Sequence, residues 1–95
     1  MTKTDQDSRF DLDAGLATLE GWTLNDETAL EKHFKFKDFS RAFGFMAQVA
    51  LLAEKANHHP DWSNSYNRVT ITLKTHDEAS VTQKDIDLAK AIDAL

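Results

Sequence analysis

The order of hydrophobic and polar residues in the first third of the chain predicts a helix followed by two strands. Apolar residues recur at helical spacing from Leu12 through Leu16 to Leu19. Asp11 stands where it can cap the start of this helix, and Gly21 stands where a left-handed residue is expected after its end. The two strands are expected at residues 22–24 and 30–37, with a turn at residues 25–26 between them.

Residues 39–56 carry the strongest helical pattern, and their apolar surface is broader than one sheet requires. A narrow polar stripe holds Arg41, Gln48 and Lys55, and Phe45 and Leu52 lie beside it. The opposite arc holds Phe39, Ala42, Phe43, Met46, Val49, Ala50 and Ala53. Because a helix lying on one sheet buries an arc of roughly 100°, this one is expected to be buried on a second side, against another copy of the chain. The alternative is a helix with a few exposed apolar residues.

The second half of the chain predicts two more strands and a last helix. Pro60 disfavours the helical region for the residue before it, so the long helix should end within residues 57–60. Strands are expected at residues 61–63 and 68–75, joined by a turn at residues 64–65. Thr82 and Asp85 are spaced as in a capping box that would open the last helix. The inner face of that helix is expected to hold Ile86, Leu88, Ala89, Ile92 and Leu95.

These elements follow the order α-β-β-α-β-β-α, which is typical of an α+β fold. We expect two layers: a four-stranded antiparallel sheet with three helices packed on one face. With 95 residues, the chain has the length of one domain. We expect residues 1–8 to be a flexible N-terminus and residues 9–95 to form the domain.

Composition narrows the classes of function. Lysine and arginine number 11 against 16 aspartates and glutamates, for a formal net charge of −5, which opposes direct binding of nucleic acid. The absence of cysteine excludes disulfides and thiolate metal sites. The longest apolar run, residues 49–53, is too short to cross a membrane. Because residues 1–7 are polar and do not resemble a secretory leader, we expect a cytoplasmic protein.

Histidines carry the clearest candidate chemistry. His58, His59 and His76 lie near the ends of predicted strands, whereas His33 is expected on an outward strand face as a plain surface residue. Imidazole exchanges protons near neutral pH, so two of them facing one cavity would suit a reaction that needs an acid and a base. The alternatives are a structural cap at the end of the long helix and a zinc site built from the three histidines. A serine nucleophile is disfavoured, because no serine lies in a strand-turn-helix elbow.

Two carboxylates and one tryptophan have a structural and a functional interpretation each. Asp85 falls on the inner arc of the last helix, where it can cap backbone N–H groups or orient a histidine. Glu54 is a solvated acid at the end of a helix or a second histidine partner. Trp62 is a core aromatic residue or the wall of a flat pocket.

A specific motif makes a family resemblance visible. Residues 54–62 read Glu-Lys-Ala-Asn-His-His-Pro-Asp-Trp. They are followed by Tyr66, Val69, Leu73, Thr75, His76, Thr82, Asp85, Leu88 and Ala89. This pattern resembles the pterin-4a-carbinolamine dehydratase family, whose animal members also act as a dimerisation cofactor of a hepatocyte homeodomain factor. The motif covers residues 54–89, and the order of predicted elements extends the resemblance to nearly the whole chain.

The resemblance implies dehydration of 4a-hydroxytetrahydrobiopterin, or a related pterin, to the quinonoid dihydropterin and water. In the family this reaction recycles the pterin used by aromatic amino-acid hydroxylases, usually phenylalanine hydroxylase, and it requires no metal or organic cofactor. The implied catalytic residues are His58, His76 and His59. The implied substrate-binding residues are His58, His59, Pro60, Thr75, His76, Asp77 and Glu78. Supporting positions match Glu54, Trp62 and Asp85.

The resemblance also raises a question about one loop and about partners. Ala79 and Ser80 replace glycines that are common in the family, so a positive φ there would have to be adopted without glycine. The family forms dimers and tetramers partly through its long helix, so a homo-oligomer, more often the tetramer, is expected through residues 39–56. The second class of function is a non-catalytic protein-binding module or transcriptional coactivator that uses the surface of this helix.

Overall fold

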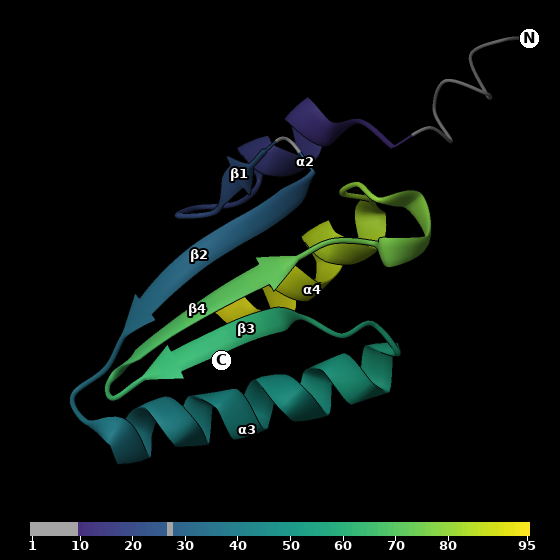
Figure 1. Cartoon of the computed structure of the whole chain (residues 1–95). Coiled ribbons are helices and arrows are strands. Elements are labelled where there is room, and N and C mark those ends of the chain that lie inside the picture. The colour runs from purple at the N-terminus through teal and green to yellow at the C-terminus, as the bar shows by residue number, and fades with distance from the viewer. Residues whose placement is uncertain (1–9, 27) are drawn as a thin grey trace, which may run out of the picture.

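In the computed structural model, which describes residues 10–26 and 28–95, one antiparallel sheet is covered by helices (Figure 1). Its elements are α2 (Leu12–Ala17), β1 (Thr23–Asn25), β2 (Ala29–Lys35), α3 (Phe39–Ala56), β3 (Asp61–Ser65), β4 (Arg68–Leu73), the 3₁₀ turn η1 (His76–Glu78) and α4 (Gln83–Asp93). The strand order is β1-β2-β4-β3. The expected α+β fold, with its order α-β-β-α-β-β-α, is therefore confirmed for the described residues. Residues 1–8, expected to be flexible, lie outside the described ranges.

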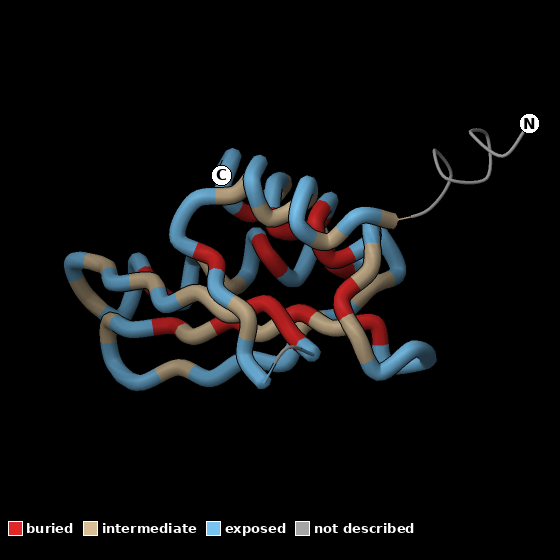
Figure 2. The backbone as a smooth tube through the Cα atoms, turned by 90° about the horizontal axis from the view of Figure 1, so that it is seen from above, coloured by how far each residue is buried: buried red, intermediate tan, exposed pale blue. Residues whose placement is uncertain are grey.

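The core lies between the sheet and the helices, where the buried positions gather in Figure 2. The central strand β4 alternates as predicted, with Val69, Ile71 and Leu73 fully buried. Opposite them, α4 buries Ile86, Leu88, Ala89 and Ile92 as expected. Full burial of each large aliphatic side chain stabilises the fold by about 1.5–3 kcal/mol. This packing holds α4 against the sheet. Leu95 is 50% exposed, and its expected place on the inner face is wrong.

The long helix α3 has the predicted bounds but a different inner face. Ala42, Val49 and Ala53 are buried as expected, and Phe45 and Leu52 pack against the core although the pattern placed them beside the polar stripe. Phe39 and Phe43, expected within the apolar arc, are 49% and 60% exposed. The inner face of α3 is thus turned toward the polar stripe, because α4 and β4 contact that flank of the helix. An apolar strip is left facing solvent.

The end of α3 is decided by Asn57 rather than by Pro60. Asn57 adopts a left-handed conformation with φ 53°, and its N–H donates to the carbonyls of Ala53 and Glu54. The N–H of His58 also donates to the carbonyl of Ala53, at 3.0 Å. These bonds satisfy the last helical carbonyls in the manner of a left-handed cap. They also fix the backbone of His58 directly beneath the last turn.

The strand boundaries show where turn prediction fails. β3 runs to Ser65, and the turn comes at residues 66–67, with Tyr66 left-handed at φ 53°. The predicted turn at residues 64–65 is wrong because the side chain of Asn64 donates to the carbonyls of Tyr66 and Arg68 and supports a later turn. β4 ends at Leu73, two residues earlier than predicted.

The N-terminal elements differ from the prediction at their ends. β1 covers Thr23–Asn25 instead of residues 22–24, and β2 covers Ala29–Lys35 instead of residues 30–37. Asp11 caps α2 as predicted, by accepting from the N–H of Ala14, but the helix ends at Ala17. Gly21 is left-handed, with φ 85°, in the turn that leads to the buried Trp22. The indole N–H of Trp22 donates to Asp93, which also pairs with Lys32, so the two ends of the described fold are tied together. No helix in the described ranges combines the length and the apolar character needed to cross a membrane.

Candidate functional site

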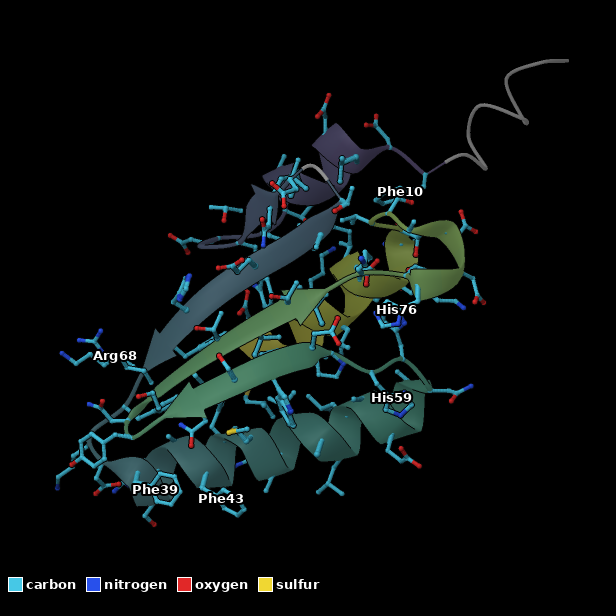
Figure 3. The ribbon with its side chains drawn as sticks, in the orientation of Figure 1. Phe10, Phe39, Phe43, His59, Arg68 and His76 are labelled. Atoms are coloured by element: carbon cyan, nitrogen blue, oxygen red, sulfur yellow. The ribbon has the colours of Figure 1, made fainter. Side chains whose placement is uncertain are left out.

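Three histidines meet at one end of the sheet because three chain segments end there. His58 and His59 follow the last turn of α3, and His76 opens η1 after β4. β3 and β4 are antiparallel neighbours, with Asp61 opposite Thr72, so the start of one strand lies beside the end of the other. Figure 3 shows His59 and His76 at this shared end. The hairpin of β3 and β4 brings these two residues together although they are distant in sequence.

A cavity of about 270 Å³ opens between these segments. Its lining residues are Asn57, His58, His59, Lys74, Thr75, His76, Asp77 and Lys84. All three histidines predicted as site residues are present, together with Thr75 and Asp77. Asn57, Lys74 and Lys84 were not anticipated, because a cap residue and two lysines carry no distinctive signal in a single sequence.

The remaining predicted binding and supporting residues lie around this cavity rather than on its lining. Pro60 is half-buried after the two histidines, and Glu78 is exposed at the end of η1. Trp62 is 37% exposed on β3, which places it neither fully in the core nor in the cavity wall. His33, expected to be a surface residue, has a side chain that is 73% exposed on β2, and this prediction is confirmed.

The central contact of the site is a buried pair between His58 and Asp85. His58 Nε2 lies 2.6 Å from Asp85 Oδ1, and the two side chains are only 11% and 0% exposed. Asp85 belongs to the first turn of α4, whose N-cap is Thr82. The buried start of α4 therefore faces the end of α3, and the carboxylate bridges the two helices.

The second oxygen of Asp85 is occupied by the capping box and by Thr75. The backbone N–H of Thr82 donates to Asp85 Oδ2 at 2.8 Å, and the Thr75 hydroxyl donates to the same oxygen at 2.8 Å. Since the Thr75 proton is used in that bond, Thr82 donates its own hydroxyl proton to Thr75 Oγ1, at 2.6 Å. No buried side-chain nitrogen or oxygen in the described ranges lacks a partner. Both interpretations offered for Asp85, cap and histidine partner, hold at once.

This network fixes the tautomer of His58. A carboxylate oxygen can only accept a hydrogen bond, so His58 Nε2 carries the proton that Asp85 Oδ1 receives. The other ring nitrogen, Nδ1, forms no hydrogen bond to a described residue and holds a lone pair in the neutral ring. Such a histidine can accept a proton, and the buried carboxylate then stabilises the imidazolium that results.

The other two histidines have carboxylate partners in a wetter setting. His59 Nε2 lies 3.0 Å from Glu54 Oε1, and His76 Nε2 lies 3.3 Å from Asp61 Oδ2. All four side chains are more than half exposed, so these contacts are weak and exchange readily with water. Glu54 is thus both a solvated acid and a histidine partner. Asp61 was missed, because only the strand register places it near His76.

The described residues do not form a metal site. In residues 10–26 and 28–95 there is no group of three histidine, cysteine, aspartate or glutamate side chains that could hold a metal ion. The histidines instead pair singly with separate carboxylates, and the zinc arrangement considered from the sequence finds no support in this geometry. The chemistry that the site offers is proton transfer and hydrogen bonding.

The loop after His76 contains a left-handed backbone conformation that is adopted without glycine. Ala79 adopts the left-handed conformation, with φ 51°, and its N–H donates to the carbonyl of His76 at 3.2 Å. Thr75 and Ser80 then pair as an isolated bridge that closes the loop. Left-handed backbone costs a residue with a Cβ about 1–2 kcal/mol. Ala79 carries this cost in the loop that presents His76 and Asp77.

Comparison with known proteins places this fold and site in a defined class of small α+β protein. Residues 6–95 match the family model described as pterin 4 alpha carbinolamine dehydratase, and the chain belongs to that family. Provisionally named pterin-4-alpha-carbinolamine dehydratases are 60% identical in Rhodospirillum rubrum, over 88% of both chains, and 52% identical in Brucella ovis, over 90% of this chain and 89% of the relative.

Solved structures agree with this assignment. A Brucella melitensis protein described as a transcriptional coactivator/pterin dehydratase superimposes with a TM-score of 0.85 at 50% identity, over 92% of this chain and 97% of the other. A pterin dehydratase-like RuBisCO assembly factor of the alpha-carboxysome has a TM-score of 0.67 at 23% identity, over 79% and 88% of the two chains. The second similarity concerns the fold alone.

The tautomer of His58 can be tested in an Asp85→Asn variant. With the imidazole neutral, ¹⁵N spectra of the wild-type protein should show the His58 proton on Nε2. In the variant the amide oxygen must serve Thr75 and Thr82, so the amide NH₂ faces His58 and the proton should move to Nδ1. The free energy of unfolding should fall by about 1–3 kcal/mol. Asp87→Asn, on the exposed side of α4, is the matched control, and an unchanged His58 tautomer in Asp85→Asn would contradict the network.

The strain at Ala79 predicts that glycine stabilises the loop. Ala79→Gly should raise the free energy of unfolding in urea by about 0.5–1 kcal/mol, because the gain from relieving left-handed strain exceeds the entropy cost of glycine. Ala94→Gly is the control, since Ala94 has φ −84° and gains nothing from glycine. Equal destabilisation by both substitutions would show that Ala79 is unstrained.

Proposed function

We propose that this protein dehydrates a 4a-hydroxytetrahydropterin, with 4a-hydroxytetrahydrobiopterin as the principal candidate, to the quinonoid dihydropterin and water. The observation that carries the proposal is the buried pair between His58 and Asp85, whose histidine lines a cavity together with His59 and His76. Membership of the dehydratase family supplies the class of substrate.

The reaction needs two proton movements and no net oxidation. The bond between C4a and its hydroxyl oxygen breaks, a proton reaches that oxygen, and water leaves. A ring nitrogen loses a proton, and its electron pair forms the new double bond to carbon. General acid–base assistance typically accelerates such steps by about 10²–10⁴-fold. Because carbinolamines already tend to lose water, two positioned imidazoles are sufficient.

The environments of the histidines suggest their roles. His58 takes the proton from the ring nitrogen, since its Nε2 is held by Asp85 and the buried carboxylate favours the imidazolium. His76 gives a proton to the departing hydroxyl and is recharged from water, because its side chain is 61% exposed. His59, supported by Glu54, contacts the substrate at the rim.

The cavity lining suits a flat ring that is rich in donors and acceptors. Thr75 and Asp77 belong to the bridged loop, where backbone groups can pair with the edge of a pterin. By resemblance, Pro60 and Glu78 complete the contacts and Trp62 lies behind them. The proposed reaction uses no metal or organic cofactor. We place it in the cytoplasm, in the recycling of tetrahydrobiopterin beside an aromatic amino-acid hydroxylase.

The acid–base pair predicts the effect of removing either histidine. His58→Ala and His76→Ala should each lower kcat about 100-fold or more, and the double variant should lose less than the product of the two. The measurement follows the ultraviolet absorbance of freshly generated 4a-hydroxytetrahydropterin, corrected for spontaneous dehydration. His33→Ala serves as the matched control outside the cavity. Normal turnover in both single variants would remove the assignment.

The exposed apolar strip of α3 supports a second proposal, that the protein forms a homo-oligomer. We favour a tetramer over a dimer. Phe39 and Phe43 are 49% and 60% exposed one turn apart on the helix, and Leu51 is 72% exposed two turns further along. Phe39 and Phe43 also stack on each other with ring centroids 6.0 Å apart. Apolar side chains gathered in this way are typical of an interface between proteins. The same strip would serve the alternative function, a protein-binding module or coactivator.

A negative charge in the apolar strip of α3 should dissociate the oligomer. In sedimentation at about 100 µM the wild-type protein is expected as an oligomer, and Phe43→Glu should shift it toward smaller species because a carboxylate would be buried without a partner. Gln48→Glu, on the polar stripe of the same helix, is the control. A monomeric wild-type protein would contradict self-association.

The dehydration assay separates the two classes of function. A protein that retains a pterin without turning it over would favour the binding module over the enzyme.

A further inference from the structure

The face of the sheet that points away from the helices carries a second, separate cleft. Its volume is about 520 Å³, and its lining residues are His33, Phe34, Lys35, Ser63, Ser65, Arg68, Val69 and Thr70. None of them lines the histidine cavity. Figure 3 places Arg68 at the end of the sheet opposite His59 and His76. A ligand in this cleft would not compete directly with one held by the three histidines.

Strand register places two cations directly opposite each other in this cleft. Lys35 on β2 is the cross-strand partner of Arg68 on β4, and both are exposed on the outer face. Like charges in this relation destabilise a sheet. Neither side chain has a carboxylate within 4.0 Å among the ion pairs of the described residues. In a chain with a net charge of −5, two uncompensated cations side by side mark a place for an anion from outside.

Hydroxyl groups continue from this pair of cations. Ser65 is opposite Arg68, and in the next row Ser63, Thr70 and His33 are successive cross-strand partners. Thr70 Oγ1 lies 3.0 Å from His33 Nδ1. The carboxylate of Glu31 is already engaged on both oxygens, by His33 at 2.8 Å and by Asn25 at 2.7 Å. Glu31 therefore directs neither carboxylate oxygen at Lys35 or Arg68.

We propose that this cleft binds a phosphorylated, hydroxyl-rich small molecule of the sugar phosphate class, with the phosphate between Lys35 and Arg68. Arginine and lysine together with a serine hydroxyl are typical phosphate donors, and the side chains of Ser63 and Thr70 pair with the hydroxyl groups of the ligand. Both ring nitrogens of His33 are held by Thr70 and Glu31, so His33 orients Thr70 rather than contacting the ligand. The cleft offers no base-stacking platform, since Phe34 is its one aromatic carbon ring and lies in the core-facing row, packed on Phe45. Recognition therefore rests on charge and hydrogen bonds.

A titration followed by amide NMR tests the site with ribose 5-phosphate, ribose and inorganic phosphate at constant ionic strength. Ribose 5-phosphate should shift the amides of Lys35, Arg68 and Thr70 and bind more tightly than inorganic phosphate, whereas ribose should cause no shift. Arg68→Gln should weaken binding about two- to fivefold, as expected for loss of one exposed charged contact. Lys90→Gln, a charge-matched change on α4, should not weaken it. Shifts that are equal in Arg68→Gln and wild type, or that fall on the histidine cavity, would overturn the proposal.

The unfolding temperature is a second test of the site, and it requires no assignment of NMR resonances. At low salt Arg68→Gln should raise Tm by about 1–5 °C, because it removes one of two facing like charges. Ribose 5-phosphate should raise the Tm of the wild-type protein more than the Tm of this variant at the same ligand concentration. A lower Tm for Arg68→Gln without ligand would show that the two cations do not repel, and the proposal would lose its physical basis.

Discussion

A carboxylate with no exposed surface determines how this fold is assembled around its site. Burial of a charge is costly unless hydrogen bonds replace the water, and Asp85 receives them from His58, Thr75 and Thr82. These partners come from the end of α3, the end of β4 and the cap of α4. Any displacement of one segment would leave a buried charge unsatisfied, so the contact that completes the fold also fixes the histidine proposed as the base.

The three histidine–carboxylate pairs differ in burial more than in distance. His58 is shielded and permanently oriented, while His59 and His76 face water with partners that water can replace. An acid that must be recharged benefits from exposure, and a base that must be held in one tautomer benefits from burial. The division of roles that we propose follows from this difference, because all three side chains have the same intrinsic chemistry.

The molecule separates its features in space. One end of the sheet carries the histidines, the opposite end of its open face carries Lys35 and Arg68, and α3 presents Phe39 and Phe43 away from the core. The first of these features is the one on which the proposed dehydration rests.

Local pattern in the sequence determined the elements with strong periodicity or caps: α3 from Phe39 to Ala56, the buried face of β4, and the Thr82–Asp85 capping box. These depend on neighbours in the chain, which a sequence displays directly. The tertiary structure decided which side of α3 faces the core, that Asp85 meets His58, and that Asp61 meets His76. Those outcomes depend on packing and strand register between segments that are distant in sequence. The pattern of residues along one chain does not show which distant segments will be in contact.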